Sequence, residues 1–404
     1  MTFSGTDQVR QRAADYGSAA FGDGWAPTQW ATAPGRLELL GNHVDYNGGP
    51  VLAAAIDRVV AIGISMTGNP GSIQLVAGDV DAESWRIDIA SIGDWHANGE
   101  HAGPPSYANG IVAALKSRQI PIRDGLQLSV AGNVPLGFGM SSSAALCVAL
   151  VLALAESAPS DRDIVLIAQE AEHRAGAPVG AMDQSASVAG GIIIFDGANV
   201  SFERIEPDLG EFVFAVADSG VEHQNAMSSY PERVRESQEA LAILRRDLLP
   251  DLSSLGAITD DDWEIIERSG TSWLNETLMK RTRHIVSEVR RVREGIVAVQ
   301  HNDWTSFGTL MNASGHSSAE DYEISHPLVE ELVNAMIPLQ GVLGARMMGG
   351  GEGGPALALL RRNHVAEIES ALVDGYFTQH PTGGAAHDRF QICTFGKGAD
   401  LQSV

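Results

Sequence analysis

A loop of glycines and serines at residues 135–144, the glycine-serine loop, carries the first side chains whose types and spacing could do chemistry. Its sequence is Pro-Leu-Gly-Phe-Gly-Met-Ser-Ser-Ser-Ala, and an apolar helix is expected to follow it. Glycines let backbone amides approach phosphates, a helix start favours negative charge, and serine hydroxyls can bind Mg²⁺. The loop predicts a triphosphate site, and a helix start with small packing residues is the alternative. Its candidate phosphate-binding residues are Gly137, Gly139, Ser141, Ser142 and Ser143.

Other glycine and serine patterns point away from two common classes of site. The loop lacks the GxxxxGK[ST] pattern and the second glycine of a hydrolase nucleophile elbow. A GxGxxG pattern at Gly349, Gly351 and Gly354 comes before a short apolar run at 356–360 that is typical of a strand. Since a dinucleotide site needs a helix there, we expect a glycine turn instead.

Polar side chains concentrate in a second glycine-bounded loop at residues 34–49. Each hydroxyl of a sugar needs a placed hydrogen-bond partner, and a loop of this composition supplies several. A solvated polar loop is the alternative, and a metal site made by His43 and Asp45 alone has weaker support. The loop contains Arg36, Asn42, His43, Asp45 and Tyr46.

Alternating and β-branched patterns predict the strands that position these two loops. Strands are expected on both sides of the polar loop, within residues 30–66, and another at 126–136, just before the glycine-serine loop. A boundary is expected near 200–210, where Pro207 and acidic residues interrupt the pattern. The predicted domains are therefore residues 1–204 and 205–404. Helices are predicted at 144–155, 162–174, 229–246, 276–299 and 326–338.

Length and charge restrict the class of protein. A chain of 404 residues suits two domains, and its net charge of -24 disfavours binding to nucleic acid or to an anionic membrane. Apolar runs are too short for a membrane span, and the first residues do not resemble a secretory signal, so a cytoplasmic location is expected. The two cysteines, Cys147 and Cys393, are expected to be ordinary reduced residues.

Several segments, in an order that covers about residues 30–360, then carry a specific resemblance. Residues 36–47 resemble the galactokinase signature, and residues 135–144 resemble the phosphate loop of the wider GHMP family of galacto-, homoserine, mevalonate and phosphomevalonate kinases. Further similar segments follow in the family order at 180–184, 230–233 and 344–354. The resemblance implies an α/β fold of two domains, with a mixed sheet and helices in each and the active site in the interdomain cleft.

The same resemblance implies roles for the residues of the reaction. Asp183 would accept the proton of the anomeric hydroxyl, and Arg36 would orient Asp183 and stabilise the transferring phosphoryl group. ATP would be the co-substrate, and Ser143 would bind Mg²⁺ with Glu172 as a second ligand. The segment from Glu172 to Gly180 is one residue shorter than usual in the family, so a carboxylate on an exposed helix face is the alternative for Glu172.

Asn42, His43, Asp45, Gly180 and Tyr230 are the residues that the resemblance places on the sugar. Galactokinases normally carry glutamate at the position of Asn42, which faces the C6 end of the sugar. An amide there could bind a hydroxymethyl group or an acid. We therefore predict a galactose 1-kinase, with galacturonate, L-arabinose or N-acetylgalactosamine as alternative substrates.

Two other hypotheses, a non-catalytic sensor and a different kinase of the same wider family, are less favoured. A sugar and nucleotide sensor without turnover disagrees with the presence of Arg36, Ser143 and Asp183. A mevalonate-type or homoserine-type kinase would not carry the substrate loop at 41–46. Departures from the family pattern leave the residue that stacks on the nucleotide base unidentified; they are Pro104, Cys147, Met348 and Glu352.

Overall fold

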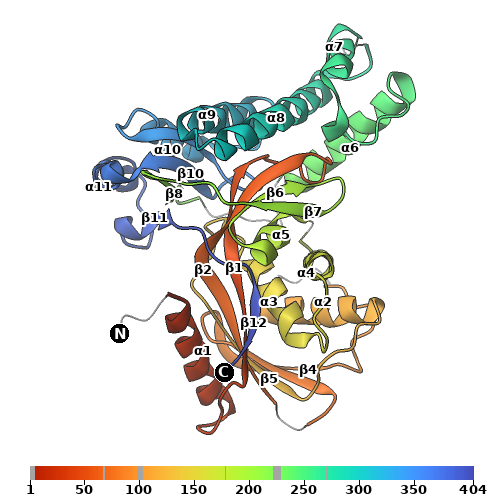
Figure 1. The fold of residues 1–404 in the computed structure, drawn as a ribbon, viewed down its shortest axis with the longest axis vertical. Helices are drawn as coiled ribbons and strands as arrows, with labels where there is room; N and C mark the ends of the chain where they lie inside the picture. Colours follow the sequence, from red (N-terminus) through yellow and green to blue (C-terminus); the bar gives the residue numbers. More distant parts are fainter. Residues whose placement is uncertain (1–4, 67–68, 98–102, 178, 222–228, 270–271) are drawn as a thin grey trace.

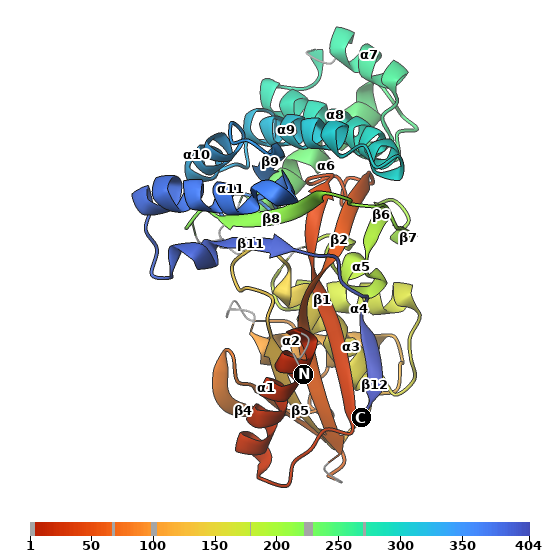
Figure 2. The ribbon, with the colours of Figure 1, turned by 60° about the vertical axis from the view of Figure 1, so that its left-hand side comes forward.

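The computed structural model describes residues 5–66, 69–97, 103–177, 179–221, 229–269 and 272–404. Two sheets with helices packed on them lie one above the other along the long axis of the molecule (Figures 1 and 2). This arrangement confirms the predicted α/β class.

The lower sheet contains eight strands within the described residues, in the order β12-β1-β2-β5-β3-β4, and β6 and β7 continue from β2. It is mixed, because β3 and β5 run parallel while β1 and β2 run antiparallel. Its strands are β1 (Gln29–Leu40), β2 (Pro50–Met66), β3 (Ser72–Ala77), β4 (Asp81–Asp88), β5 (Leu126–Gly132), β6 (Ile192–Asp196), β7 (Ser201–Ile205) and β12 (Asp400–Ser403).

Strand β1 brings polar side chains to one face and apolar side chains to the other. Leu37 and Leu39 are fully buried in the core, and the alternation of a strand places Arg36 and Glu38 on the opposite face. The pairing with β2 shifts register just before Arg36 and just after Glu38. Such bulges re-aim side chains and are common beside active sites.

Helices cover both faces of the lower sheet. Alternate residues of β2 contact opposite layers: Val59 and Ala61 pack against α1, whereas Val60 and Ile62 belong to the main core. Helix α3 packs between the sheet and helices α2 and α4, which explains why it is apolar on all sides. The helices are α1 (Gly5–Phe21), α2 (Pro104–Ser117), α3 (Ser142–Leu154), α4 (Asp161–Arg174) and α5 (Met182–Ala189).

The upper sheet has the order β11-β8-β10-β9 and is antiparallel throughout its described strands, whereas a mixed sheet was expected in each domain. Helices α9 and α10 pack on it, and α8 also contacts β1 and β2 of the lower sheet. The elements are α6 (Tyr230–Asp247), α7 (Asp260–Ser269), α8 (Glu276–Gln300), α9 (Trp304–Glu320), α10 (Pro327–Met336), α11 (Val365–Leu372), β8 (Phe212–Asp218), β9 (Val342–Met347), β10 (Pro355–Arg361) and β11 (Phe390–Cys393).

The glycine-rich segment before β10 is a turn between antiparallel strands, as the sequence predicted. After β11 the chain leaves the upper sheet, and its last strand, β12, pairs antiparallel with the start of β1 in the lower sheet (Figure 2).

The predicted division of the chain into domains at 204/205 stays a prediction. Within the described part of the chain, no helix has the length and apolar character to cross a membrane. Both cysteines are buried and unbonded, as expected.

Candidate active site

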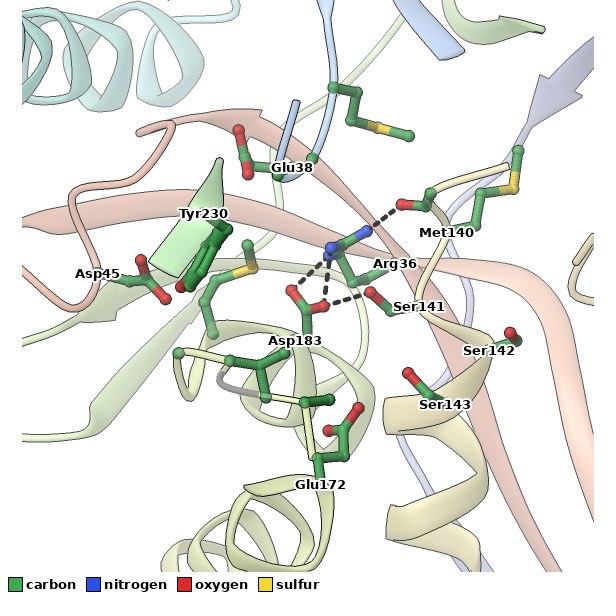
Figure 3. Close-up of a pocket in the computed structure, with 18 of the residues that line it drawn as sticks. Arg36, Glu38, Asp45, Met140, Ser141, Ser142, Ser143, Glu172, Asp183 and Tyr230 are labelled. Carbon is green, nitrogen blue, oxygen red and sulfur yellow. Dashed lines mark hydrogen bonds and ion pairs between the residues drawn. The ribbon is translucent and has the colours of Figure 1, made fainter. Parts of the chain in front are cut away.

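A pocket lies where the two sheets approach each other, and segments far apart in the sequence form its wall (Figure 3). The lower sheet supplies β1, the polar loop after it, the glycine-serine loop and the start of α5. The upper part supplies the start of α6 and the turn between β9 and β10. The polar and charged side chains at the wall are those of Arg36, Glu38, His43, Asp45, Ser141, Ser142, Ser143, Glu172, Asp183 and Tyr230.

Arg36 and Asp183 form a two-pronged ion pair at the centre of this pocket. The Nε and Nη2 atoms of Arg36 lie 2.7 and 2.8 Å from the two carboxylate oxygens of Asp183. The Ser141 hydroxyl donates to the same carboxylate, and Nη1 of Arg36 donates to the Gly139 carbonyl. A fork of this kind fixes the plane of a carboxylate. The base predicted from the sequence is thereby held beside the glycine-serine loop.

The glycine-serine loop has the backbone of an anion cradle. Gly137, Gly139 and Ser141 have φ values of 79°, 59° and 57°, and α3 begins at the next residue. A left-handed serine is uncommon, and such strained residues gather at functional sites. Left-handed residues at every second position and the positive end of a helix together favour a bound anion. All five predicted loop residues line the pocket.

Glu172 lies at the pocket wall near the start of α3, not on an exposed helix face. Its side chain is buried and accepts hydrogen bonds from Ser143 and Gln184. Burial, with the nearby charge of Asp183, raises its pKa to about 7. Tyr107 of α2 hydrogen-bonds the same serine hydroxyl and was missed from the sequence.

Two oxygen groups at Ser143 and Glu172 fit a hard divalent cation that keeps its other positions for phosphate and water. The described residues contain no cluster of three or more His, Cys, Asp or Glu side chains that could hold a metal alone. A cation at this wall would therefore need further ligands from a bound phosphate and from water.

Asp45, Gly180 and Tyr230 form the other end of the pocket. A Cβ atom on Gly180 would lie 1.5 Å from Oδ2 of Asp45, so only glycine allows this close approach. Desolvation, with the charges of Asp183 and Glu38, raises the pKa of Asp45 to about 7. The Tyr230 hydroxyl hydrogen-bonds the backbone of Gly180. The three residues form one wall with an acid and a ring side by side.

His43 stands beside this wall in a left-handed conformation, with φ of 60°. Its Nδ1 atom lies 2.8 Å from the Tyr46 hydroxyl, which in turn lies 2.9 Å from the Tyr322 hydroxyl. Its ring centre lies 4.9 Å from that of Tyr230. The chain of hydroxyls and rings fixes the orientation of His43 at the pocket.

Asn42 is the one predicted site residue that the structure places elsewhere. It is fully buried, and its Nδ2 atom donates to Glu38 Oε1 at 2.9 Å and to the Gly349 carbonyl at 2.8 Å. The hydroxyl of Ser318 donates a hydrogen bond to the side-chain oxygen Oδ1 of Asn42. The amide is thus used inside the protein, and the pocket wall beside it is formed by Glu38. The alternation of β1, with Glu38 two residues after Arg36, was the signal that could have found it.

Helix α8 supports the polar loop from behind. Glu288 accepts from the Gly41 amide at 3.0 Å, from Ser314 at 2.7 Å and from Arg291 at 2.7 Å. Burial alone would raise its pKa, but its interactions with Arg291, His284 and Arg346 outweigh burial and lower the pKa to about 2. The loop is therefore anchored to the upper part of the molecule by an ionised carboxylate.

Three family models match the chain. The GHMP kinases N terminal domain matches residues 106–191, the GHMP kinases C terminal domain matches 296–377, and the galactokinase galactose-binding signature matches 18–66. The first contains the glycine-serine loop and Asp183, the second contains strands β9 and β10 of the upper sheet, and the third contains the polar loop. The fold and the site are those of a GHMP-type small-molecule kinase.

Curated relatives and a solved structure narrow this class. The galactokinase of Chloroflexus aurantiacus is 33% identical over 93% of this chain and 94% of its own length. That of Staphylococcus carnosus is 30% identical, covering 87% and 90%. The Lactococcus lactis galactokinase solved with galactose superposes with a TM-score of 0.86, at 26% identity, covering 97% and 99%. The chain belongs to the galactokinase family.

Proposed function

We propose that this protein is an ATP-dependent kinase that phosphorylates the anomeric hydroxyl of galactose, giving galactose 1-phosphate and ADP. The observation that carries the proposal is the Arg36–Asp183 ion pair in one pocket with the glycine-serine loop. The galactokinase relatives cover nearly the whole chain, and the similar Lactococcus lactis enzyme was solved with galactose.

Phosphoryl transfer requires the protein mainly to align two oxygens around phosphorus and to balance the charge that spreads over the phosphoryl group. Asp183 takes the proton of the C1 hydroxyl as the new P–O bond forms and the bond to the leaving ADP breaks. Arg36 holds the plane of that carboxylate and places a positive charge beside the transferred group. Backbone amides of the glycine-serine loop hold the phosphates.

The sugar lies against the end of the pocket formed by Asp45, Gly180, His43 and Tyr230. A carboxylate accepts from two neighbouring hydroxyls, which suits the C3 and C4 hydroxyls for Asp45. The aromatic ring of Tyr230 covers an apolar face of the sugar. This division places C1 toward Asp183 and the other hydroxyls toward the polar loop.

Ser143 and Glu172 are the residues that would hold Mg²⁺ with the nucleotide. The cation, when bound, balances the charge of the phosphates and helps to orient them. Glu172 has to be ionised for this role, and a bound cation favours that form. The proposed partners are a small-molecule sugar and ATP, and a cytoplasmic location stays a prediction.

The test is turnover by wild type and by Asp183→Asn in a coupled assay of ADP release over a panel of sugars. We expect galactose to be the preferred substrate and the variant to lose roughly 10²-fold or more in kcat while it still binds ATP. Asp23→Asn, at an exposed turn, is the matched control and should keep its activity. Unchanged kcat in Asp183→Asn would remove the base assignment, and ATP binding without turnover in wild type would identify a sensor.

A further inference from the structure

Glu38 is a charged side chain at the pocket wall for which the proposed reaction has no role so far. It lies on the same face of β1 as Arg36, and its side chain is 7% exposed. Figure 3 shows it on the side of Arg36 where Tyr230 lies, away from Ser142 and Ser143. A buried carboxylate at this place needs a partner for each of its oxygens.

One oxygen of Glu38 is satisfied by the protein. Oε1 accepts from Arg346 Nη2 at 2.8 Å and from Asn42 Nδ2 at 2.9 Å. Arg346 is fully buried and also donates to the main-chain oxygen of Glu38. The buried guanidinium balances the charge of the carboxylate and fixes its position. Among the described residues, the hydrogen bonds of Glu38 leave Oε2 free to accept from a ligand in the pocket.

The charge around the sugar end is also unusual for a pocket that would take an acid. Glu38, Asp45 and Asp183 all face this end, and only Asp183 and Glu38 are paired with a guanidinium. The mutual repulsion contributes to the raised pKa of Asp45. A fourth carboxylate, on a sugar acid, would meet the repulsion of these three carboxylates at short range.

We propose that Glu38 determines the sugar specificity of this protein, accepting a hydrogen bond from a hydroxyl other than that at C1 and excluding sugar acids from the pocket. The proposal rests on the proposed galactose 1-kinase activity. It replaces the reason for admitting galacturonate, because the neutral amide of Asn42 is turned into the protein and a carboxylate stands at the wall.

The test compares wild type, Glu38→Gln and Glu38→Asp with galactose, 2-deoxygalactose, 6-deoxygalactose and galacturonate. For Glu38→Gln we expect kcat/KM on galactose to fall about 10- to 100-fold, the usual effect of losing a hydrogen bond to a charged group. The fall in kcat/KM caused by Glu38→Gln should be at least about 5-fold smaller on the analogue that lacks the bonded hydroxyl than on galactose. The preference for galactose over galacturonate should fall at least about 10-fold in Glu38→Gln and persist in Glu38→Asp, which keeps the charge.

Equal losses on every sugar, with the preference against galacturonate unchanged, would show that Glu38 only supports the fold and would overturn the proposal. Thermal unfolding of each variant measures how much stability is lost when the buried Arg346 has no charged partner, separately from the effect on the sugar. If Glu38→Gln does not fold, Glu38→Asp and wild type still decide, because wild type that turns over galacturonate as well as galactose contradicts the proposal. Wild type inactive on every sugar would instead contradict the proposed function.

Discussion

Four carboxylates face the pocket, and their electrostatic partners differ. Asp183 is paired with Arg36 and Glu38 with Arg346. Within the described residues, Asp45 and Glu172 form no salt bridge, and the pKa of each is raised to about 7. A ligand that brings hydroxyl donors or a cation would therefore lower the pKa of these two residues by stabilising their ionised forms.

The residue-scale prediction concerns Glu172 and pH. Since the folded state holds its proton up to about pH 7 and an unfolded glutamate releases it near 4.5, stability without ligand should fall as pH rises through this window. Glu172→Gln removes this cost, on the order of 3 kcal/mol. We expect the variant to unfold at a higher temperature than wild type at pH 8, without nucleotide, and to show a shallower dependence on pH between 5 and 7.5.

The same variant tests the cation. Mg²⁺ with a non-hydrolysable ATP analogue should raise the unfolding temperature of wild type more than that of Glu172→Gln, because the carboxylate is the charged ligand. Asp45→Asn is the matched control, since it removes the other raised pKa and should keep the full Mg²⁺ effect. An equal Mg²⁺ effect in wild type and Glu172→Gln would place the cation elsewhere.

At the scale of elements, the local patterns predicted most helices and strands near the site. The helix after the glycine-serine loop, the helices near 162–174, 229–246 and 276–299, and the glycine turn before residue 356 are all present. Their periodicity is set by burial on one face, which a sequence displays directly. The upper sheet was expected to be mixed and is antiparallel, because strand direction depends on long connections that periodicity does not show.

The direction of a side chain in a turn was harder to predict than the turn itself. The polar loop was expected from its glycines, yet Asn42 points into the protein because its amide bonds Glu38 and the distant Gly349 carbonyl. A contact over three hundred residues of sequence leaves no local pattern. Glu38 could have been found from the period of two along β1, whereas its partner Arg346 could not.

The element-scale prediction concerns the close approach of the α4–α5 connection to the polar loop. Gly180→Ala would place a Cβ atom 1.5 Å from Oδ2 of Asp45, so the loop carrying the acid has to move. We expect KM for galactose to rise at least about 10-fold with a smaller change in KM for ATP, since the glycine-serine loop is separate. Steady-state kinetics with each substrate varied measures both.

Gly24→Ala is the matched control for this glycine, because nothing lies within 4 Å of its Cβ position. It should leave both KM values unchanged. A Gly180→Ala enzyme with an unchanged KM for galactose would mean that the sugar does not contact Asp45, and the proposed sugar end of the pocket would have to be reassigned.

At the scale of the whole molecule, the pocket depends on holding two sheets in a fixed relation. Helix α8 contacts β1 and β2, and Glu288 anchors the Gly41 amide across this junction. After β11 the chain returns to the lower sheet. Gly398 packs closely against Gly190 and the carbonyl of Val188, and the following strand β12 pairs with β1. Long-range pairing of this kind was not predicted, because four residues at the end of a chain carry too little pattern to identify an edge strand.

The last prediction concerns this terminal strand. Deleting residues 399–404 removes the β1–β12 ladder and the contacts of Arg10 with Asp400 and Gln402 at the end of β1 distant from Arg36. Losing several such bonds should cost about 2–4 kcal/mol and lower the unfolding temperature by roughly 4–16 °C, while kcat at 25 °C stays within about twofold. Deleting Val404 alone is the control and should change little. A large loss of kcat in the folded deletion variant would show that β12 also sets the position of Arg36 on β1, and an unchanged unfolding temperature would show that the strand contributes nothing to stability.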